Sequence, residues 1–504
     1  MSSVIRSGLS ASAGRIVVTF ANLGRDASIA LVYGTSATVD AFFLAMMIPV
    51  FILTVGTGAY RNSIVPIIEQ IAHTSKRASG GAILGKLMIS NLPAVLGLGL
   101  LLAIFAPLYA PFMSGTHSSA TAHLILTFSL VVLPMFLLSG YASLADGPLQ
   151  TLGSFFGPSV LRAGLPIGVA LGAIVLGKDY GVEGACFGGF IGAGVQLSLT
   201  FLLMRKKGGF ASSGTTIDKP LQIEIRKQFL LLSAGVSLAY ISPVVDQWMA
   251  AYLDAGSVSI LGYANRLVVG LASLTIGTLS AALLPHFSRL YSQGDLRSLG
   301  TDYCTILRLT VWGSIALAGI VWLLSEPLVM VLYERGSFTQ TDTTAVATMI
   351  SWLCLQFPPL FFGIPGATLL SAAGLNRAFI PLNIIAALTN ISGNFLLMRL
   401  YGLAGIALST VLTYFVSAIA INVLIHKKAI AAIPSRLIFE IVISGGTAAA
   451  IGAVLIMMNW KPGRIPTSAE LCFSSLGLLI YCLVAIGSNR SLLKAFLSRG
   501  PSMA

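Results

Sequence analysis

Charged side chains are scarce in this chain. Only 9% of its 504 residues are Asp, Glu, Lys or Arg, whereas soluble domains carry about 25%. Hydrophobic residues make up 56% of the sequence, and the mean hydropathy is +0.89. This composition excludes a soluble globular protein and indicates a protein of the membrane interior.

Enzyme motifs and cysteine patterns are also missing. The five cysteines are odd in number, scattered and mostly within apolar runs, so no disulfide framework or metal spacing is visible. The sequence has no H-E-x-x-H, no G-x-x-x-x-G-K-[ST] and no G-x-S-x-G motif. We therefore expect no enzyme, no bound cofactor and no hydrolysis of ATP by the chain itself. A membrane glycosyltransferase or ligase is the enzyme alternative, but it should carry a sizeable extracytoplasmic loop, and the outer loops here are short.

Apolar runs of about 20 residues recur from end to end, each long enough to cross a bilayer as a helix. Breaks at Gly, Pro, Asn and charged clusters divide the chain into about fourteen spans. The predicted spans are 9–33, 38–66, 82–108, 120–146, 155–177, 183–204, 228–252, 258–287, 303–333, 343–371, 379–398, 403–425, 436–458 and 468–487. The sequence therefore predicts an all-α polytopic membrane protein.

The longest connection between spans is rich in Gly and Ser and contains Pro220, which is typical of a flexible linker. We predict an N-terminal six-helix lobe at 1–207, a cytoplasmic linker at 208–227, a C-terminal six-helix lobe at 228–427, and two further helices with a cytoplasmic tail at 428–504. A faint repeat favours two lobes, because Asp26 and Asp246 lie 220 residues apart, as do Phe43 and Tyr263. Many transporters are built from such repeats.

Basic residues predict the orientation of the spans. Of the thirty Lys and Arg residues, twenty fall on one side of the membrane, five fall on the other, and five lie in the spans. Because basic loops favour the cytoplasm, both termini are expected to be cytoplasmic. The net charge of +13 is thus mainly a topology signal. It does not indicate nucleic-acid binding, since no soluble basic domain carries it.

The five remaining arginines lie inside or at the edges of spans, and they are Arg15, Arg25, Arg61, Arg162 and Arg266. An arginine at the centre of a spanning helix costs roughly 2.5–3.5 kcal/mol, so such residues usually face a protein interior or a water-filled cavity. Its guanidinium is always charged and offers a fixed fork to phosphate oxygens. The sequence therefore predicts a cationic interior and an anionic cargo, for which a lipid-linked pyrophosphate is suited. A cation or drug exporter would instead place carboxylates in its cavity.

Three charged positions are the first candidates for the cavity. Arg25 adjoins Asp26, which either neutralises it as an ion pair or orients it toward the cavity. Asp40 begins the second span and is either a helix-start acid or an arginine partner. Arg266 lies about two turns into the eighth span with no obvious local acid, so a site role is favoured.

Three further arginines lie closer to the inner ends of their spans. For Arg15, Arg61 and Arg162, the alternative to a site role is snorkelling of the side chain to the lipid headgroups.

Several short motifs occur in a familiar order over most of the chain. They are Gly24-Arg25-Asp26-Ala27, Tyr33-Gly34, Val39-Asp40-Ala41-Phe42-Phe43-Leu44-Ala45, Gly58-Ala59-Tyr60, Tyr263-Ala264-Asn265-Arg266-Leu267 and Leu332-Tyr333-Glu334-Arg335-Gly336-Ser337-Phe338-Thr339. Together they resemble the MurJ/MviN lipid II flippase family of the multidrug/oligosaccharidyl-lipid/polysaccharide exporter superfamily. The resemblance implies two six-helix lobes around a central cavity, with two additional C-terminal helices.

By the same resemblance, the chain would flip an undecaprenyl-pyrophosphate-linked saccharide, lipid II, from the inner to the outer leaflet of the bacterial cytoplasmic membrane by alternating access. Arg25, Asp40 and Arg266 match cavity positions of the family, and Arg15 matches a further basic position with a longer spacing. The implied partners are the lipid-linked glycan, the bilayer, and the cell-wall or polysaccharide synthesis machinery. A scaffold that binds partners without transport is a further alternative.

Two departures from the family pattern affect the predicted cargo. Where the family usually has a basic pair after the proline of the second span, this chain has Ile52-Leu53-Thr54, and Asn265 replaces a frequent Asp. Arg61, seven residues after Thr54 and on the same helical face, would lie about 10 Å lower. A flippase for an exopolysaccharide or O-antigen repeat unit is therefore an alternative to a lipid II flippase.

A sodium site is described for some family members, and four residues here resemble its positions in spacing. They are Asp246, Asn390, Asn394 and Thr410, with neutral Asn394 in place of an acid. Ordinary polar contacts between helices are the alternative. Sodium or proton coupling is the expectation that follows from the resemblance.

Overall fold

The computed structural model describes residues 2–74, 78–115, 119–208 and 219–431. Over these residues the secondary structure is helical and contains no strand, so the predicted all-α class is confirmed. The helices fall into two compact units, which are described separately below.

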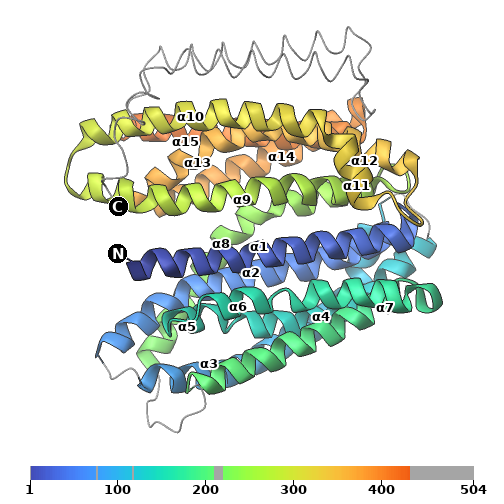
Figure 1. The fold of residues 1–504 in the computed structure, drawn as a ribbon, viewed down its shortest axis with the longest axis horizontal. Coiled ribbons are helices and arrows are strands. Elements are labelled where there is room, and N and C mark those ends of the chain that lie inside the picture. Colours follow the sequence, from blue (N-terminus) through green and yellow to red (C-terminus); the bar gives the residue numbers. More distant parts are fainter. Residues whose placement is uncertain (1, 75–77, 116–118, 209–218, 432–504) are drawn as a thin grey trace. The chain divides into compact units, whose positions relative to one another are not determined.

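Unit 1 contains Met1–Tyr263 together with the inserted segment Tyr333–Asp342. Its helices are α1 (Ser2–Tyr33), α2 (Ala37–Thr74), α3 (Ala78–Met113), α4 (Ser119–Ser143), α5 (Asp146–Thr151), α6 (Phe156–Leu161), α7 (Gly164–Lys206), α8 (Lys219–Ala250) and the start of α9 (Ser257–Ser292). Helix α2 packs against α4, α5 and α8, while α1 lies along α6 and α7 (Figure 1).

Unit 2 contains Ala264–Leu332 and the described residues from Thr343 onward. Besides most of α9, its helices are α10 (Leu296–Leu323), α11 (Ser325–Tyr333), α12 (Gln340–Leu353), η1 (Cys354–Gln356), α13 (Phe357–Ala372), η2 (Asn376–Ala378), α14 (Phe379–Tyr401) and α15 (Leu403–Lys427). Phe287, Tyr303 and Ile425 are fully buried in its core. The Tyr303 hydroxyl donates a 2.6 Å hydrogen bond to the side-chain oxygen of Asn422.

Eleven helical segments of the described residues are long and apolar enough to cross a membrane. They correspond to the first twelve predicted spans, because the fifth and sixth run together as Phe156–Lys206. The spans predicted at 436–458 and 468–487 lie outside the described residues, so the count of fourteen stays a prediction.

The two units divide later in the chain than the predicted linker at 208–227. The division falls between Tyr263 and Ala264, and α8 already begins at Lys219, within the predicted linker. The assignment of two six-helix lobes stays a prediction.

A glycine hinge explains why two predicted spans form one element. Gly181, inside α7, has φ 58° and ψ −145°, a conformation that side chains disfavour. Tyr33 at the end of α1 donates its hydroxyl to the Gly181 carbonyl at 2.7 Å. The chain therefore reverses within α7, and two antiparallel halves pack on each other.

The same hinge recurs in unit 2. Gly402, between α14 and α15, has φ 56° and ψ −132° and lies 221 residues after Gly181. A β-carbon at Gly184 would lie 2.9 Å from the Leu176 carbonyl oxygen, and one at Gly405 would collide with the Leu397 carbonyl oxygen. These pairs also differ by 221 residues, so each unit contains a glycine hinge of the same geometry. The repeat at an offset of 220 that the sequence suggested stays a prediction.

Small residues hold the two halves of α7 together. Gly164, Gly168 and Gly172 face Gly192, Gly188 and Gly184, with backbone against backbone. Helix association in membranes depends on such close packing, because lipid supplies no hydrophobic driving force between helices.

Replacing Gly188 with alanine is expected to destabilise unit 1. The new methyl group would collide with the Gly168 carbonyl oxygen and lie 2.5 Å from the Gly172 Cα, and overpacking typically costs about 1–3 kcal/mol. The measurement is thermal unfolding of the purified protein, with Gly194→Ala as the matched control because its β-carbon meets open space. Equal stability of the two variants would contradict the glycine packing.

Candidate functional site

Arg25 and Asp26 form an ion pair inside unit 1. The Arg25 Nε and Nη2 atoms both donate to Asp26 Oδ1, at 2.9 and 2.8 Å. The Asp26 side chain is 1% exposed and the Arg25 side chain 17% exposed. The structure thus forms the pair that was one alternative for this motif.

The pairing leaves part of the guanidinium available. Arginine carries five N–H donors in a planar fork, and the contacts to Asp26 use only the side formed by Nε and Nη2. The opposite edge, with Nη1, makes no hydrogen bond or ion pair among the described residues. Gly24 beside it is exposed, and a β-carbon there would meet open space. Asp26 therefore orients Arg25 without occupying its second edge.

Asp40 caps the start of another helix. Its Oδ2 accepts the Gly256 N–H at 2.6 Å and its Oδ1 accepts the Ser259 N–H at 2.7 Å, and the side chain is buried. These N–H groups lie at the N-terminus of α9, where a carboxylate is favoured by the helix dipole. The observed role of Asp40 is thus to join α2 to α9, and a cargo contact stays a prediction.

The motif at Gly336-Ser337-Phe338-Thr339 closes over the turn between α1 and α2. Ser337 donates its N–H to the Leu31 carbonyl at 2.9 Å and its hydroxyl to the Val32 carbonyl at 2.9 Å. Gly34 (φ 62°) lies against the Ser337 carbonyl, and Gly336 (φ 61°) lies against the Leu31 carbonyl. Neither position leaves room for a β-carbon. We call Gly34, Asp40, Gly256 and Ser337 the turn cluster.

Aromatic rings support the turn cluster from within unit 1. Tyr263 is fully buried, stacks edge-on with Phe43 at 5.4 Å and lies 5.2 Å from the Tyr333 ring. Its hydroxyl donates to the Gly34 carbonyl at 3.2 Å. The end of unit 1 that carries the turn between α1 and α2 is thus densely closed.

The other predicted arginines lie in different surroundings. Arg266 is half-buried in the part of α9 that belongs to unit 2. Arg15 and Arg61 are exposed on α1 and α2, and the Arg61 stem packs 3.0 Å from the position a Gly147 β-carbon would take. Arg15 and Arg25 lie ten residues apart on α1, which is about 15 Å along the helix.

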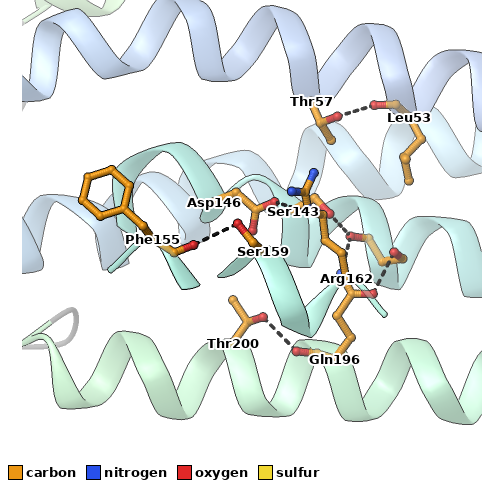
Figure 2. A network of polar contacts seen from close by, with 10 residues as sticks. Leu53, Thr57, Ser143, Asp146, Phe155, Ser159, Arg162, Gln196 and Thr200 are labelled. Carbon is orange, nitrogen blue, oxygen red and sulfur yellow. Dashed lines mark hydrogen bonds and ion pairs between the residues drawn. The ribbon is translucent and has the colours of Figure 1, made fainter. Parts of the chain in front are cut away.

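Arg162 has a partner that the sequence analysis did not assign. Its Nε lies 3.4 Å from Oδ2 of the buried Asp146, and Figure 2 shows the two side chains pointing at one another from α5 and the end of α6. The signal available was an acid at the end of one span and an arginine at the start of the next.

Ile52 and Leu53, which stand where the family usually has basic residues, line an apolar groove. Ile52, Leu53 and Thr57 of α2 face residues of α3 and α4, including Leu98 and Leu137, around an apolar space of about 90 Å³. Thr57 turns its hydroxyl hydrogen to the Leu53 carbonyl at 2.7 Å (Figure 2). This part of α2 offers hydrocarbon to a ligand, not charge.

The candidate sodium ligands belong to both units. Asp246 is a half-buried residue of α8 in unit 1, whereas Asn390, Asn394 and Thr410 belong to unit 2. Both asparagines are fully buried on α14, and the Thr410 hydroxyl donates to the Ile406 carbonyl at 3.2 Å. No group of three or more His, Cys, Asp or Glu residues suited to a metal occurs among the described residues.

Comparison with known families gives a match over most of the chain. A family model described as "Lipid II flippase MurJ" matches residues 29–465. A "Probable lipid II flippase MurJ" of Vibrio cholerae serotype O1 is 27% identical, over 96% of this chain and 94% of the relative. One of Aquifex aeolicus with the same description is 28% identical, over 71% of this chain and 70% of the relative.

Solved structures show the same fold. A structure titled "Lipid II flippase MurJ, inward closed conformation" covers 97% of this chain and all of its own with a TM-score of 0.77 and 21% identity. An inward-facing multidrug resistance transporter of the MATE family follows with a TM-score of 0.66 and 15% identity, covering 81% of this chain and 96% of its own.

Proposed function

Because this chain belongs to the lipid II flippase MurJ family, we propose that it moves lipid II, an undecaprenyl-pyrophosphate-linked saccharide, from the inner to the outer leaflet by alternating access. Membership of that family makes it a transporter and not an enzyme. The curated relatives that it matches are described as probable lipid II flippases, which favours lipid II over an exopolysaccharide or O-antigen unit.

The observation that carries this proposal is the geometry at Arg25. The buried Asp26 holds one side of the guanidinium, and the other edge remains available to accept a second anion. A phosphate group offers the paired oxygens that fit such an edge. Arg25 can therefore bind and release a pyrophosphate without losing its orientation.

Alternating access requires the turn cluster to open. Asp40 holds Gly256 and Ser259, and Ser337 holds the end of α1, so these hydrogen bonds oppose opening at this end. The basic loops predict that both termini lie on the cytoplasmic side of a bacterial inner membrane. The turn between α1 and α2 is then at the outer end of unit 1. We assign the turn cluster to the outer gate.

Coupling to sodium is the proposed source of directional transport, with proton coupling as the alternative. Oxygen atoms are the ligands that hard cations prefer, and Asn390, Asn394 and Thr410 supply them from α14 and α15. A dependence of transport on sodium at constant pH would support this set, and indifference to sodium would exclude it. Contact with the machinery of cell-wall synthesis is a further proposal from the family.

The proposed function is tested with the purified full-length chain in liposomes that contain labelled lipid II. Transport should bring label from the inner leaflet to an impermeant quencher outside, faster than in vesicles without protein. A labelled phospholipid, which carries a single headgroup phosphate and no pyrophosphate, serves as the cargo control. Equal rates for vesicles with and without the protein would contradict the function.

Replacing Arg266 with alanine is expected to lower this transport strongly. The residue is a half-buried cation in an apolar helix, and ionisable residues inside membrane helices mark cargo pathways. Loss of one charge-assisted contact to phosphate lowers transport about tenfold or more. Arg399→Ala in the same unit is the control, because Arg399 is exposed and stacks on Phe395 at 4.0 Å; equal rates in both variants would exclude Arg266 from the site.

A further inference from the structure

The strongest unassigned feature of unit 1 is a cluster of charges around Asp146. Packing of α1 on α6, of α2 on α5, and of α5 on α6 brings four charged side chains together. These are Arg15, Arg61, Arg162 and Asp146, and the charge of Arg61 interacts with those of the other three. Three cations around one carboxylate leave the cluster with a net charge of +2.

Close backbone contacts fix the cluster in place. Gly14, beside Arg15, packs so tightly on Ser159 of α6 that no β-carbon fits there. Gly147, beside Asp146, leaves room for the Arg61 stem. The cluster is therefore built by the fold, and it lies ten residues from Arg25 along α1, about 15 Å at the rise of a helix.

Within the part of the chain that the structure describes, the guanidinium groups of Arg15 and Arg61 make no hydrogen bond. Both side chains are exposed. Arg162 reaches Asp146 only through Nε, at 3.4 Å. The guanidinium forks of all three are thus available for an anion with several oxygens.

The apolar groove of α2, α3 and α4 ends beside this cluster. Thr57, which lines the groove, precedes Arg61 by one helical turn, and Leu144, which also lines it, is two residues from Asp146. A ligand that combines a phosphate headgroup with a hydrocarbon chain fits both parts at once. A free phosphate would use only the charged part.

We propose that Arg15, Arg61 and Arg162 bind the diphosphate of a polyprenyl lipid while its chain lies in the groove between α2, α3 and α4. A diphosphate with two substituents carries two negative charges, and undecaprenyl diphosphate, with one substituent, carries about two to three near neutral pH. Either at least balances the net charge of the cluster, whereas phosphatidylglycerol carries one negative charge. The identity of this lipid as cargo rests on the proposed function. The site is a second station for the headgroup, separate from Arg25, and it explains a basic residue at position 61 together with an apolar stretch at 52–54.

The test is equilibrium binding to the full-length protein in phosphatidylcholine nanodiscs, with undecaprenyl diphosphate as the probe. Arg61→Gln and Arg15→Gln should each weaken binding about tenfold or more, and Asp146→Asn should tighten it because a negative charge is removed. Arg205→Gln, an exposed arginine on α7, is the matched control and should bind like the wild type. Because the Arg15 side chain is exposed, the Arg15→Gln variant should fold like the wild type, and a loss of affinity then reports on the site.

Two further probes identify the source of the headgroup. Dioleoyl-phosphatidylglycerol and inorganic pyrophosphate should each bind more weakly than undecaprenyl diphosphate. Phosphatidylglycerol bound as tightly as the diphosphate would overturn the assignment to a diphosphate, and pyrophosphate bound as tightly would overturn the role of the groove. Unchanged affinity in both glutamine variants would overturn the site altogether.

The outcome separates this site from the proposed function. Wild-type transport of lipid II with unchanged affinity in Arg61→Gln and Arg15→Gln removes the site and keeps the function. Absence of lipid II transport with a tenfold loss of affinity in those variants removes the function and keeps the site.

Discussion

Replacing Arg25 with alanine is expected to abolish transport of lipid II while the protein still inserts into the membrane. The second edge of the guanidinium, opposite Asp26, would offer charge-assisted hydrogen bonds worth about 1.5–3 kcal/mol each. Loss of two such contacts reduces transport about a hundredfold or more. The measurement is the rate at which labelled lipid II reaches the outer leaflet of liposomes.

Two companion variants sharpen this prediction. Removing Arg25 alone leaves the buried Asp26 carboxylate without its ion-pair partner, which is costly. The double variant Arg25→Ala/Asp26→Asn removes that charge and separates loss of transport from loss of folding. Arg25→Lys retains the charge but has no fork that can serve Asp26 and a phosphate together, so it should also fail; a lysine variant with normal transport would show that charge alone suffices.

The second large effect is expected for Asp40→Asn at the turn cluster. The amide keeps one acceptor oxygen and turns an NH₂ group toward one of the two N–H groups that Asp40 now binds. Losing a hydrogen bond to a buried charged group costs about 1.5–3 kcal/mol. The closed form at this end should therefore be about ten- to a hundredfold less favoured.

Hydrogen exchange measures this effect directly. Amides of residues 254–263 should exchange faster in Asp40→Asn, because opening of the local structure sets their rate. Asp295→Asn is the control, since Asp295 caps α10 through the Ser298 N–H at 3.0 Å on the exposed surface. Those hydrogen bonds to Ser298 lower the pKa of Asp295, and its substitution should change exchange only in α10. Unchanged exchange at 254–263 would contradict the gate assignment.

The spans were predictable because each depends on a local run of apolar residues. The reversal inside α7 and the one between α14 and α15 could also be predicted, because Tyr-Gly-x-x-Gly occurs at both, beginning at Tyr180 and at Tyr401. The pairing of Arg25 with Asp26 was one of two alternatives, because adjacent charges can meet without any tertiary information.

Contacts between residues far apart in the sequence could not be predicted from local patterns. Asp40 binds backbone N–H groups 216 and 219 residues away, and every residue except proline offers such a donor. The partner of Arg162 depends on how α5 and α6 turn between α4 and α7. Tertiary packing decides these contacts, and a single sequence does not encode them in a local pattern.

The account is tested most directly by depleting the protein from its native cell and measuring which leaflet holds lipid II. A lipid II flippase predicts that lipid II accumulates on the cytoplasmic side and the cells lyse, with rescue by the wild type but not by Arg25→Ala/Asp26→Asn. Viable cells that keep normal lipid II distribution and lose only a surface polysaccharide would contradict it.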